Sequence, residues 1–157
     1  DAARAVNLGA AAMGDAAFDR AAMAARAGKH WTTVTELADT LVRECGVPFR
    51  VAHRIAARFV AARTADPSAA AAAALDRIAL EARGAPIGWS DDALARILSP
   101  ERFVAVRSTL GGPAPAETTR ALDVSGTKLE KDDAWRNAAM GRLKAAEDRL
   151  KAACEEL

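Results

Sequence analysis

The sequence predicts an all-α protein, and three observations support that fold class. Alanine, the strongest helix former, fills 42 of the 157 positions. Tyrosine is absent and isoleucine occurs four times, so the residues that favour strands are scarce. The larger apolar residues recur at spacings of three and four, which is the period of an amphipathic helix. A chain of this length has room for one domain with an additional helix or two.

The charge of the chain is balanced, with 22 basic and 21 acidic residues and a formal net charge of +1. Nucleic-acid binding favours a basic excess, so we expect no nucleic-acid partner. The longest uncharged run is Ala5–Gly14, and a membrane span needs roughly 20 apolar residues, so we expect no membrane partner. Cys45 and Cys154 fit no paired spacing, and no signal peptide is apparent. These features predict reduced thiols and a cytoplasmic location.

A first helix is expected over about Ala2–Ala27, with Gly28 as its stop. Gly9 and Gly14 each cost about 1 kcal/mol relative to alanine, and close approach of a neighbouring helix would compensate. The rest of the chain offers few long partners, so we expect these neighbours to belong to other chains. The helix is apolar on most sides, as is typical inside a bundle, through Val6, Leu8, Met13, Phe18 and Met23.

Several shorter helices follow, each beginning at a capping residue or a proline. The Thr33 to Glu36 stretch fits a capping box, and Gly46 and Gly84 are expected to end two of the helices. Starts are expected at Thr33, Pro48, Asp66, Ser90 and Ser99.

The C-terminal part is expected to contain a break, a short helix, a loop and a final helix. The break is Leu110–Pro115, and the short helix runs from Pro115 to Leu122. Residues 123–132 are polar and contain glycine, which predicts a surface loop. A C-terminal helix is expected over 133–157, with a coiled-coil-like seam of Trp135, Ala139, Leu143, Ala146, Leu150, Ala153 and Leu157.

Most catalytic signatures are absent from the sequence. It contains no glycine-rich nucleotide loop, no His-Glu-x-x-His site and no Cys-x-x-Cys pair. His30 and His53 lie far apart without an obvious third ligand, and neither cysteine has an activating base nearby. We therefore expect no metal site and no cofactor, and name no catalytic residue.

Four residues are candidates for substrate binding: Thr33, Thr35, Arg50 and His53. His53 is a candidate general acid or base because of its imidazole, but the simpler interpretation is a structural hydrogen bond at a helix junction. The hydroxyls and imidazole of residues 30–33 favour either an anion site at a helix N-terminus or ordinary capping. The Gly111-Gly112 pair allows either close approach to a ligand or a tight turn between helices.

Two stretches resemble a known family. Residues 33–43 (TVTELADTLVR) and 46–53 (GVPFRVAH) resemble the C-terminal region of argininosuccinate lyases, and residues 98–104 (LSPERFV) and 110–115 (LGGPAP) are similar to that family's tail. The sequence departs from the pattern with Glu36 in place of Asp, Thr40 in place of an aromatic residue, and an extra residue at Glu44-Cys45. These departures leave open a relative that acts on another amino-linked succinate.

The resemblance implies a homotetramer built on a central bundle of long helices. It also implies C–N cleavage by β-elimination, which releases fumarate in arginine biosynthesis, with a serine base in a glycine-rich loop. None of Ser68, Ser90, Ser99, Ser108 or Ser125 lies in such a loop.

We therefore expect residues 1–30 to be the end of a long bundle helix and 31–122 a small helical C-terminal domain. Because Asp1 opens directly on a helical pattern, we expect a fragment that is inactive alone. Its expected partners are the upstream part of the same lyase and sister subunits.

A second hypothesis is a free-standing helical interaction module that binds a partner through the seam at 135–157. A stable monomer whose first helix is covered would favour this module. An oligomeric or aggregating chain would favour the lyase fragment, because an exposed apolar helix needs neighbours.

Overall fold

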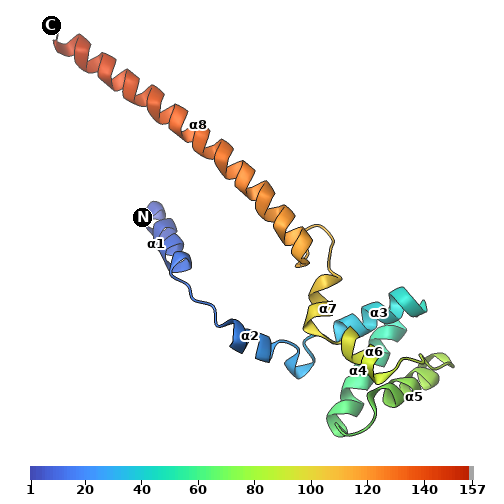
Figure 1. Cartoon of the computed structure of the whole chain (residues 1–157). Coiled ribbons are helices and arrows are strands. Elements are labelled where there is room, and N and C mark those ends of the chain that lie inside the picture. Colours follow the sequence, from blue (N-terminus) through green and yellow to red (C-terminus); the bar gives the residue numbers. More distant parts are fainter. Residues whose placement is uncertain (156–157) are drawn as a thin grey trace. The chain divides into compact units, whose positions relative to one another are not determined.

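The described part of the chain, residues 1–155 of a computed structural model, consists of helices and connecting turns (Figure 1). No strand occurs in those residues, so the all-α prediction is confirmed. Two units divide the chain, residues 1–103 and residues 104–157. The helices are α1 (Ala2–Gly14), α2 (Arg20–Arg26), a 3-10 turn (Lys29–Trp31), α3 (Thr35–Cys45), α4 (Phe49–Ala65), α5 (Ala71–Arg83), α6 (Asp91–Ile97), α7 (Pro100–Ala105) and α8 (Pro115–Glu155).

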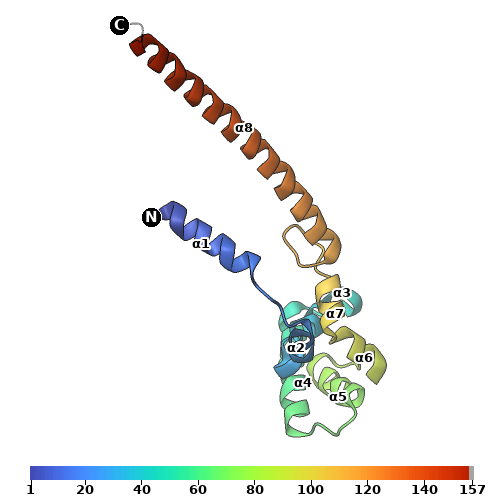
Figure 2. The ribbon, with the colours of Figure 1, turned by 60° about the vertical axis from the view of Figure 1, so that its left-hand side comes forward.

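The core of the first unit forms where α4 packs against both α3 and α5, with α6 beside α5 (Figure 2). Trp31 meets Phe59 edge-on, with ring centroids 5.8 Å apart and an interplanar angle of 80°. This contact anchors the start of the helical core to the middle of α4. The largest fully buried apolar side chains are Phe59, Leu37, Leu41, Ile55, Leu75, Ile78 and Leu94.

The expected continuous helix over 2–27 is wrong, because the chain leaves the helix between α1 and α2. Asp19 caps α2, since its Oδ1 accepts a hydrogen bond from the Ala22 N–H at 2.8 Å. Aspartate favours such caps over helix interiors, and Gly14 lies just before the break. Neither helix has a buried residue, and the apolar side chains are 59–73% exposed at Val6, Leu8, Met13, Phe18 and Met23.

Local capping chemistry predicted several helix ends correctly. Ser90 and Ser99 accept hydrogen bonds from the N–H groups of Ala93 (3.2 Å) and Arg102 (3.1 Å). Gly46 and Gly84 end α3 and α5 with φ of +62° and +79°, a backbone region that glycine enters without steric cost.

Two predicted starts are wrong. Asp66 closes a turn by accepting from the N–H groups of Ser68 and Ala69, and α5 begins only at Ala71. The Thr33 hydroxyl donates to the carbonyl oxygen of Leu98 at 2.7 Å, and Val34 is the N-cap of α3. A long-range bond thus replaces the local cap at Thr33, whereas Asp66 stabilises a separate turn ahead of α5.

The predicted loop at 123–132 is wrong, because these residues lie inside α8. Lys128, Leu129, Glu130 and Lys131 are good helix formers, and one glycine within a long helix costs only about 1 kcal/mol. The expected short helix, loop and final helix are therefore one element. The seam prediction falls on α8 except for Leu157, which lies outside the described residues.

A tight turn precedes α8 in the second unit. Gly111 has a φ of +80°, and the Gly112 N–H donates to the Thr109 carbonyl oxygen at 2.8 Å. The Ala114 N–H donates to the Arg107 carbonyl oxygen at 3.2 Å. The turn interpretation of the Gly111-Gly112 pair is confirmed.

Gly112→Ala should disrupt this turn, because a Cβ at that position would lie 2.1 Å from the carbonyl oxygen of Arg107. We expect a local loss of roughly 1–3 kcal/mol, measured as faster hydrogen exchange of the Ala114 amide. Gly126→Ala is the matched control, because its Cβ meets nothing within 4 Å. That change should stabilise α8 by up to about 1 kcal/mol. Equal exchange rates in the two variants would contradict the role assigned to Gly112.

Candidate functional site

A groove between α3 and α4 brings together two of the candidate substrate-binding residues, Thr35 and His53. Its volume is about 480 Å³. Thr35 opens the first turn of α3, and His53 lies one turn into α4. The groove is lined by Val34, Thr35, Ala38, Asp39, Phe49, His53, Ala56, Ala57 and Val60.

The surface of this groove is mainly apolar. Asp39 and His53 are its titratable groups, and the His53 ring lies 6.1 Å from the Phe49 ring at a tilt of 41°. His53 is exposed, so its imidazole stays accessible. Such a groove can accept an apolar surface with a few polar contacts, but it holds no cluster of cationic donors that would bind a dicarboxylate.

The other two candidates lie elsewhere. Thr33 is buried, and its hydroxyl joins the start of α3 to the end of α6 through Leu98. Arg50 is an exposed residue of α4 that does not line the groove. The Thr33 hydroxyl therefore supports neither of the two alternatives for residues 30–33, an anion site or a helix cap.

The connection into α3 is conformationally unusual. His30 and Trp31 have φ values of +55° and +62°, and Gly28 has +79°. A left-handed conformation costs a non-glycine residue about 1–2 kcal/mol. The Trp31–Phe59 contact helps to hold this strained turn in place.

A buried polar cluster on α3 escaped the sequence analysis. Glu36 and Thr40 are both completely buried, and the Thr40 hydroxyl donates to Glu36 Oε1 at 2.9 Å. The Arg43 guanidinium donates to the same carboxylate oxygen and, at 3.0 Å, to Thr40 Oγ1. The spacing of four and three residues on one helix face was the signal that would have found it.

This cluster explains two departures from the family pattern at once. Glu36 replaces an aspartate and Thr40 replaces an aromatic residue, and the two side chains touch. The Glu36 carboxylate accepts from the hydroxyl one turn away, so the two departures are structurally linked.

The extra residue before Gly46 also has a structural partner. Arg102 on α7 forms an ion pair with Glu44 at 3.2 Å, beside a cavity of about 440 Å³. Burial raises the pKa of the neighbouring Cys45 thiol, and the positive charge of Arg83 offsets part of this increase. A raised pKa keeps the thiol protonated and poorly nucleophilic.

Glu117, in the first turn of α8, fastens the glycine turn to the helix. Its carboxylate accepts from the Gly111 N–H at 2.9 Å and from the Arg120 guanidinium at 2.7 and 2.8 Å. These bonds favour the ionised form, and they lower the pKa of Glu117 from 4.5 to about 2.

The glycine turn should therefore loosen in acid. The folded-state pKa of Glu117 lies below its ordinary value, so its stabilising effect is complete above pH 4.5 and is lost as the pH falls towards 2. The Gly111 amide chemical shift, followed by NMR across that range, should report the loss. Glu117→Gln should remove the transition, and an unchanged transition in that variant would assign it to another group.

Two features are absent from residues 1–155. No group of three or more His, Cys, Asp or Glu side chains there is placed to hold a metal ion. Over the same residues, every helix is too short or too polar to cross a bilayer.

Comparison with known proteins matches residues 31–105, the segment from Trp31 through α7, to the family model described as argininosuccinate lyase C-terminal. An argininosuccinate lyase of Methanoculleus marisnigri is 39% identical over 138 residues, which are 88% of this chain and 28% of that protein. One from Methanospirillum hungatei is 39% identical over 132 residues, which are 82% of this chain and 26% of that protein.

Among solved structures, a variant of EDDS lyase with bound fumarate matches with a TM-score of 0.62 and 32% identity. The match covers 72% of this chain and 23% of that one. The fold is thus the helical C-terminal region of a lyase of the fumarase/aspartase superfamily. The chain belongs to the argininosuccinate lyase family. It spans about a quarter of the length of the curated relatives it matches.

Proposed function

We propose that this chain is the non-catalytic C-terminal part of an argininosuccinate lyase, which releases fumarate from argininosuccinate by C–N β-elimination in arginine biosynthesis. One observation carries the proposal: a relative matches 88% of this chain with only 28% of its own length. The sequence contains no copy of the serine loop that supplies the base in this family.

The chemistry of the described residues supports a structural role. Elimination requires a base at the carbon acid and donors for the negative charge that develops. The α3–α4 groove offers the His53 imidazole, but Arg50 does not line it and the groove walls are apolar. The chain alone is therefore proposed to be inactive. The enzyme to which it belongs is proposed to be cytoplasmic.

We also propose that residues 1–30 are bundle segments and that the small C-terminal domain begins at residue 31; its expected end at 122 lies inside α8, so the domain is proposed to end before that helix. The exposed apolar side chains of α1 and α2 support packing against the rest of the lyase and its sister subunits in a homotetramer. Burial by other segments would also provide the neighbours that Gly9 and Gly14 favour.

The fumarate-release assay tests the proposal. The chain is incubated with argininosuccinate alone, and also mixed with the preceding part of the Methanoculleus marisnigri relative, and fumarate is followed by its ultraviolet absorbance. We expect no release by either part and release by the mixture. Release by this chain alone would overturn the proposal.

Thr35 and His53 share one groove that has no cationic cluster of its own, so we propose that they supplement substrate contacts made by the rest of the lyase. In the combined enzyme, His53→Ala should raise KM about tenfold without lowering kcat, because a hydrogen bond to a charged group contributes roughly 1.5 kcal/mol. Arg50→Ala is the control on the same helix and should leave KM unchanged. Equal effects of the two substitutions would remove His53 from the site.

The alternative function, a free-standing interaction module, is favoured by one observation. The apolar side chains of the α8 seam are exposed, with Trp135 at 71% and Leu150 at 67%. Sedimentation of the purified chain discriminates the two hypotheses. A monomer whose α1 side chains are protected from solvent would favour the module.

A further inference from the structure

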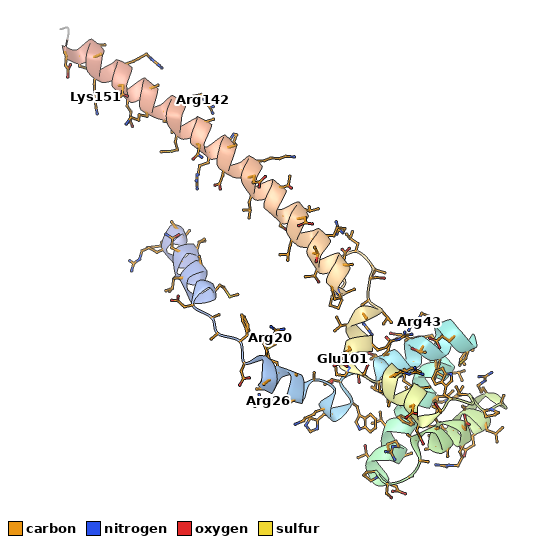
Figure 3. The ribbon with its side chains drawn as sticks, viewed as in Figure 1. Arg20, Arg26, Arg43, Glu101, Arg142 and Lys151 are labelled. Carbon is orange, nitrogen blue, oxygen red and sulfur yellow. The ribbon has the colours of Figure 1, made fainter. Side chains whose placement is uncertain are left out.

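The helix α8, the longest within residues 1–155, has almost no buried side chains. Only Glu117 in its first turn is buried. The side chains of Arg142 and Lys151 stand out from the helix along its length (Figure 3). A helix gains most of its stability from packing an apolar face, so a helix this long and this exposed requires a partner.

The apolar residues of α8 follow a heptad repeat. Leucines recur every seven residues at Leu122, Leu129, Leu143 and Leu150, with one interruption, and each is 60–67% exposed. In the second half of the helix, alanines lie three residues after positions 136, 143 and 150, at Ala139, Ala146 and Ala153. Leucine at position a and alanine at position d there form an apolar seam for a second helix.

The residues beside the seam carry opposite charges on its two sides. Position g holds Lys128, Arg142 and Arg149, whereas position e holds Asp133 and Glu147. In a parallel coiled coil, position g of one helix meets position e five residues further along its partner. Lys128 then meets Asp133 of the partner subunit, and Arg142 meets Glu147 of the partner subunit.

An antiparallel arrangement of the same helix has the opposite result. Position g then faces g and position e faces e, so arginine meets arginine and carboxylate meets carboxylate. The parallel register also places Trp135 beside Met140 of the partner subunit, which is an apolar contact. The charges therefore select a second copy of this chain, in parallel orientation, as the occupant of the seam.

Three polar residues interrupt the seam. Ser125 and Asp132 occupy two d positions, and Arg136 occupies position a between Leu129 and Leu143. Arg136 already forms an ion pair with Asp133 at 3.1 Å within its own helix. A polar residue at a single a position specifies register and a two-stranded state at a cost in stability.

We propose that α8 pairs with α8 of a second copy as a parallel two-stranded coiled coil along the seam from Leu122 to Ala153. This inference does not depend on the lyase chemistry. It concerns a different element from the α3–α4 groove.

Disulfide trapping tests the pairing in the full chain, with Cys45 and Cys154 both changed to serine. Ala146→Cys places a thiol at position d, where the two copies meet in a parallel pair. Ala145→Cys places it one residue away, at the outer position c. We expect rapid covalent dimers from the first variant and few from the second. Equal trapping at both positions, or none at Ala146→Cys, would overturn the proposal.

A charge exchange tests the orientation by sedimentation equilibrium. Arg142→Glu sets acidic groups against Glu147 of the partner subunit at two symmetric places, and should raise the dissociation constant roughly tenfold. The double variant Arg142→Glu/Glu147→Arg should restore it. A dissociation constant unaffected by the single change, or not restored by the double change, would refute parallel pairing. Neither outcome bears on fumarate release by the combined enzyme.

Discussion

Phe59→Ala should lower the free energy of unfolding of the first unit by about 3–5 kcal/mol. Phe59 is 1% exposed at the centre of α4 and holds the Trp31 ring edge-on at 5.8 Å. Its removal forfeits apolar burial and leaves a cavity that the surrounding helices fill only in part. Urea unfolding, followed by tryptophan fluorescence and by circular dichroism, measures the change.

Phe49 on the same helix provides the matched control. It is 59% exposed, so Phe49→Ala should cost less than about 1 kcal/mol. If both substitutions cost the same, the core does not lie where α4 meets α3 and α5.

Arg43→Met should destabilise the first unit by roughly 2–3 kcal/mol. The substitution keeps the aliphatic stem of Arg43 but removes the guanidinium that pairs with the fully buried Glu36 carboxylate. A buried charge that loses its ionic partner retains the cost of its desolvation. Chemical unfolding of the variant at neutral pH measures this loss.

Glu36→Gln completes a double-mutant cycle with Arg43→Met. In the double variant no carboxylate is left without its guanidinium, and the introduced amide can still accept from the Thr40 hydroxyl, so we expect most of the stability to return. Arg50→Met, at an exposed arginine of α4, should change stability by less than about 0.5 kcal/mol. Strict additivity in the cycle would show that Glu36 and Arg43 are not energetically coupled.

Helix ends that depend on one residue were predictable from the sequence. Gly46, Gly84, Ser90 and Ser99 act through backbone conformation or through bonds to residues three positions away. The boundaries between helical segments were not predictable where caps and glycines suggested a different division of the chain. The break before Asp19 and the continuity of α8 through Gly126 depend on small differences in helix propensity.

Long-range hydrogen bonds account for the other differences. Thr33 bonds to Leu98, and the Asp91 carboxylate accepts from the Ala72 N–H at the start of α5. Asp76 fixes the turn after α5 by accepting from the Ile87 and Gly88 N–H groups, each at 2.8 Å. These pairs join residues that no periodicity or cap motif associates.

The candidate site was predictable in part. Thr35 and His53 meet in the α3–α4 groove, whereas Thr33 and Arg50 do not join them. The Glu36–Thr40–Arg43 cluster was missed although its spacing was visible, because acidic residues near a helix start are ordinarily solvent-exposed. Glu36 and Thr40, the two side chains that depart from the family pattern, are buried there and bonded to each other.

The most direct test of the central claim is a hybrid enzyme. The C-terminal quarter of the Methanoculleus marisnigri relative is replaced by this chain, and fumarate release from argininosuccinate is compared with that of the truncated relative. If this chain is a non-catalytic C-terminal part, the hybrid should be active, whereas the truncated relative and the isolated chain should both be inactive. A folded hybrid without activity, or fumarate release by the isolated chain, would contradict the account.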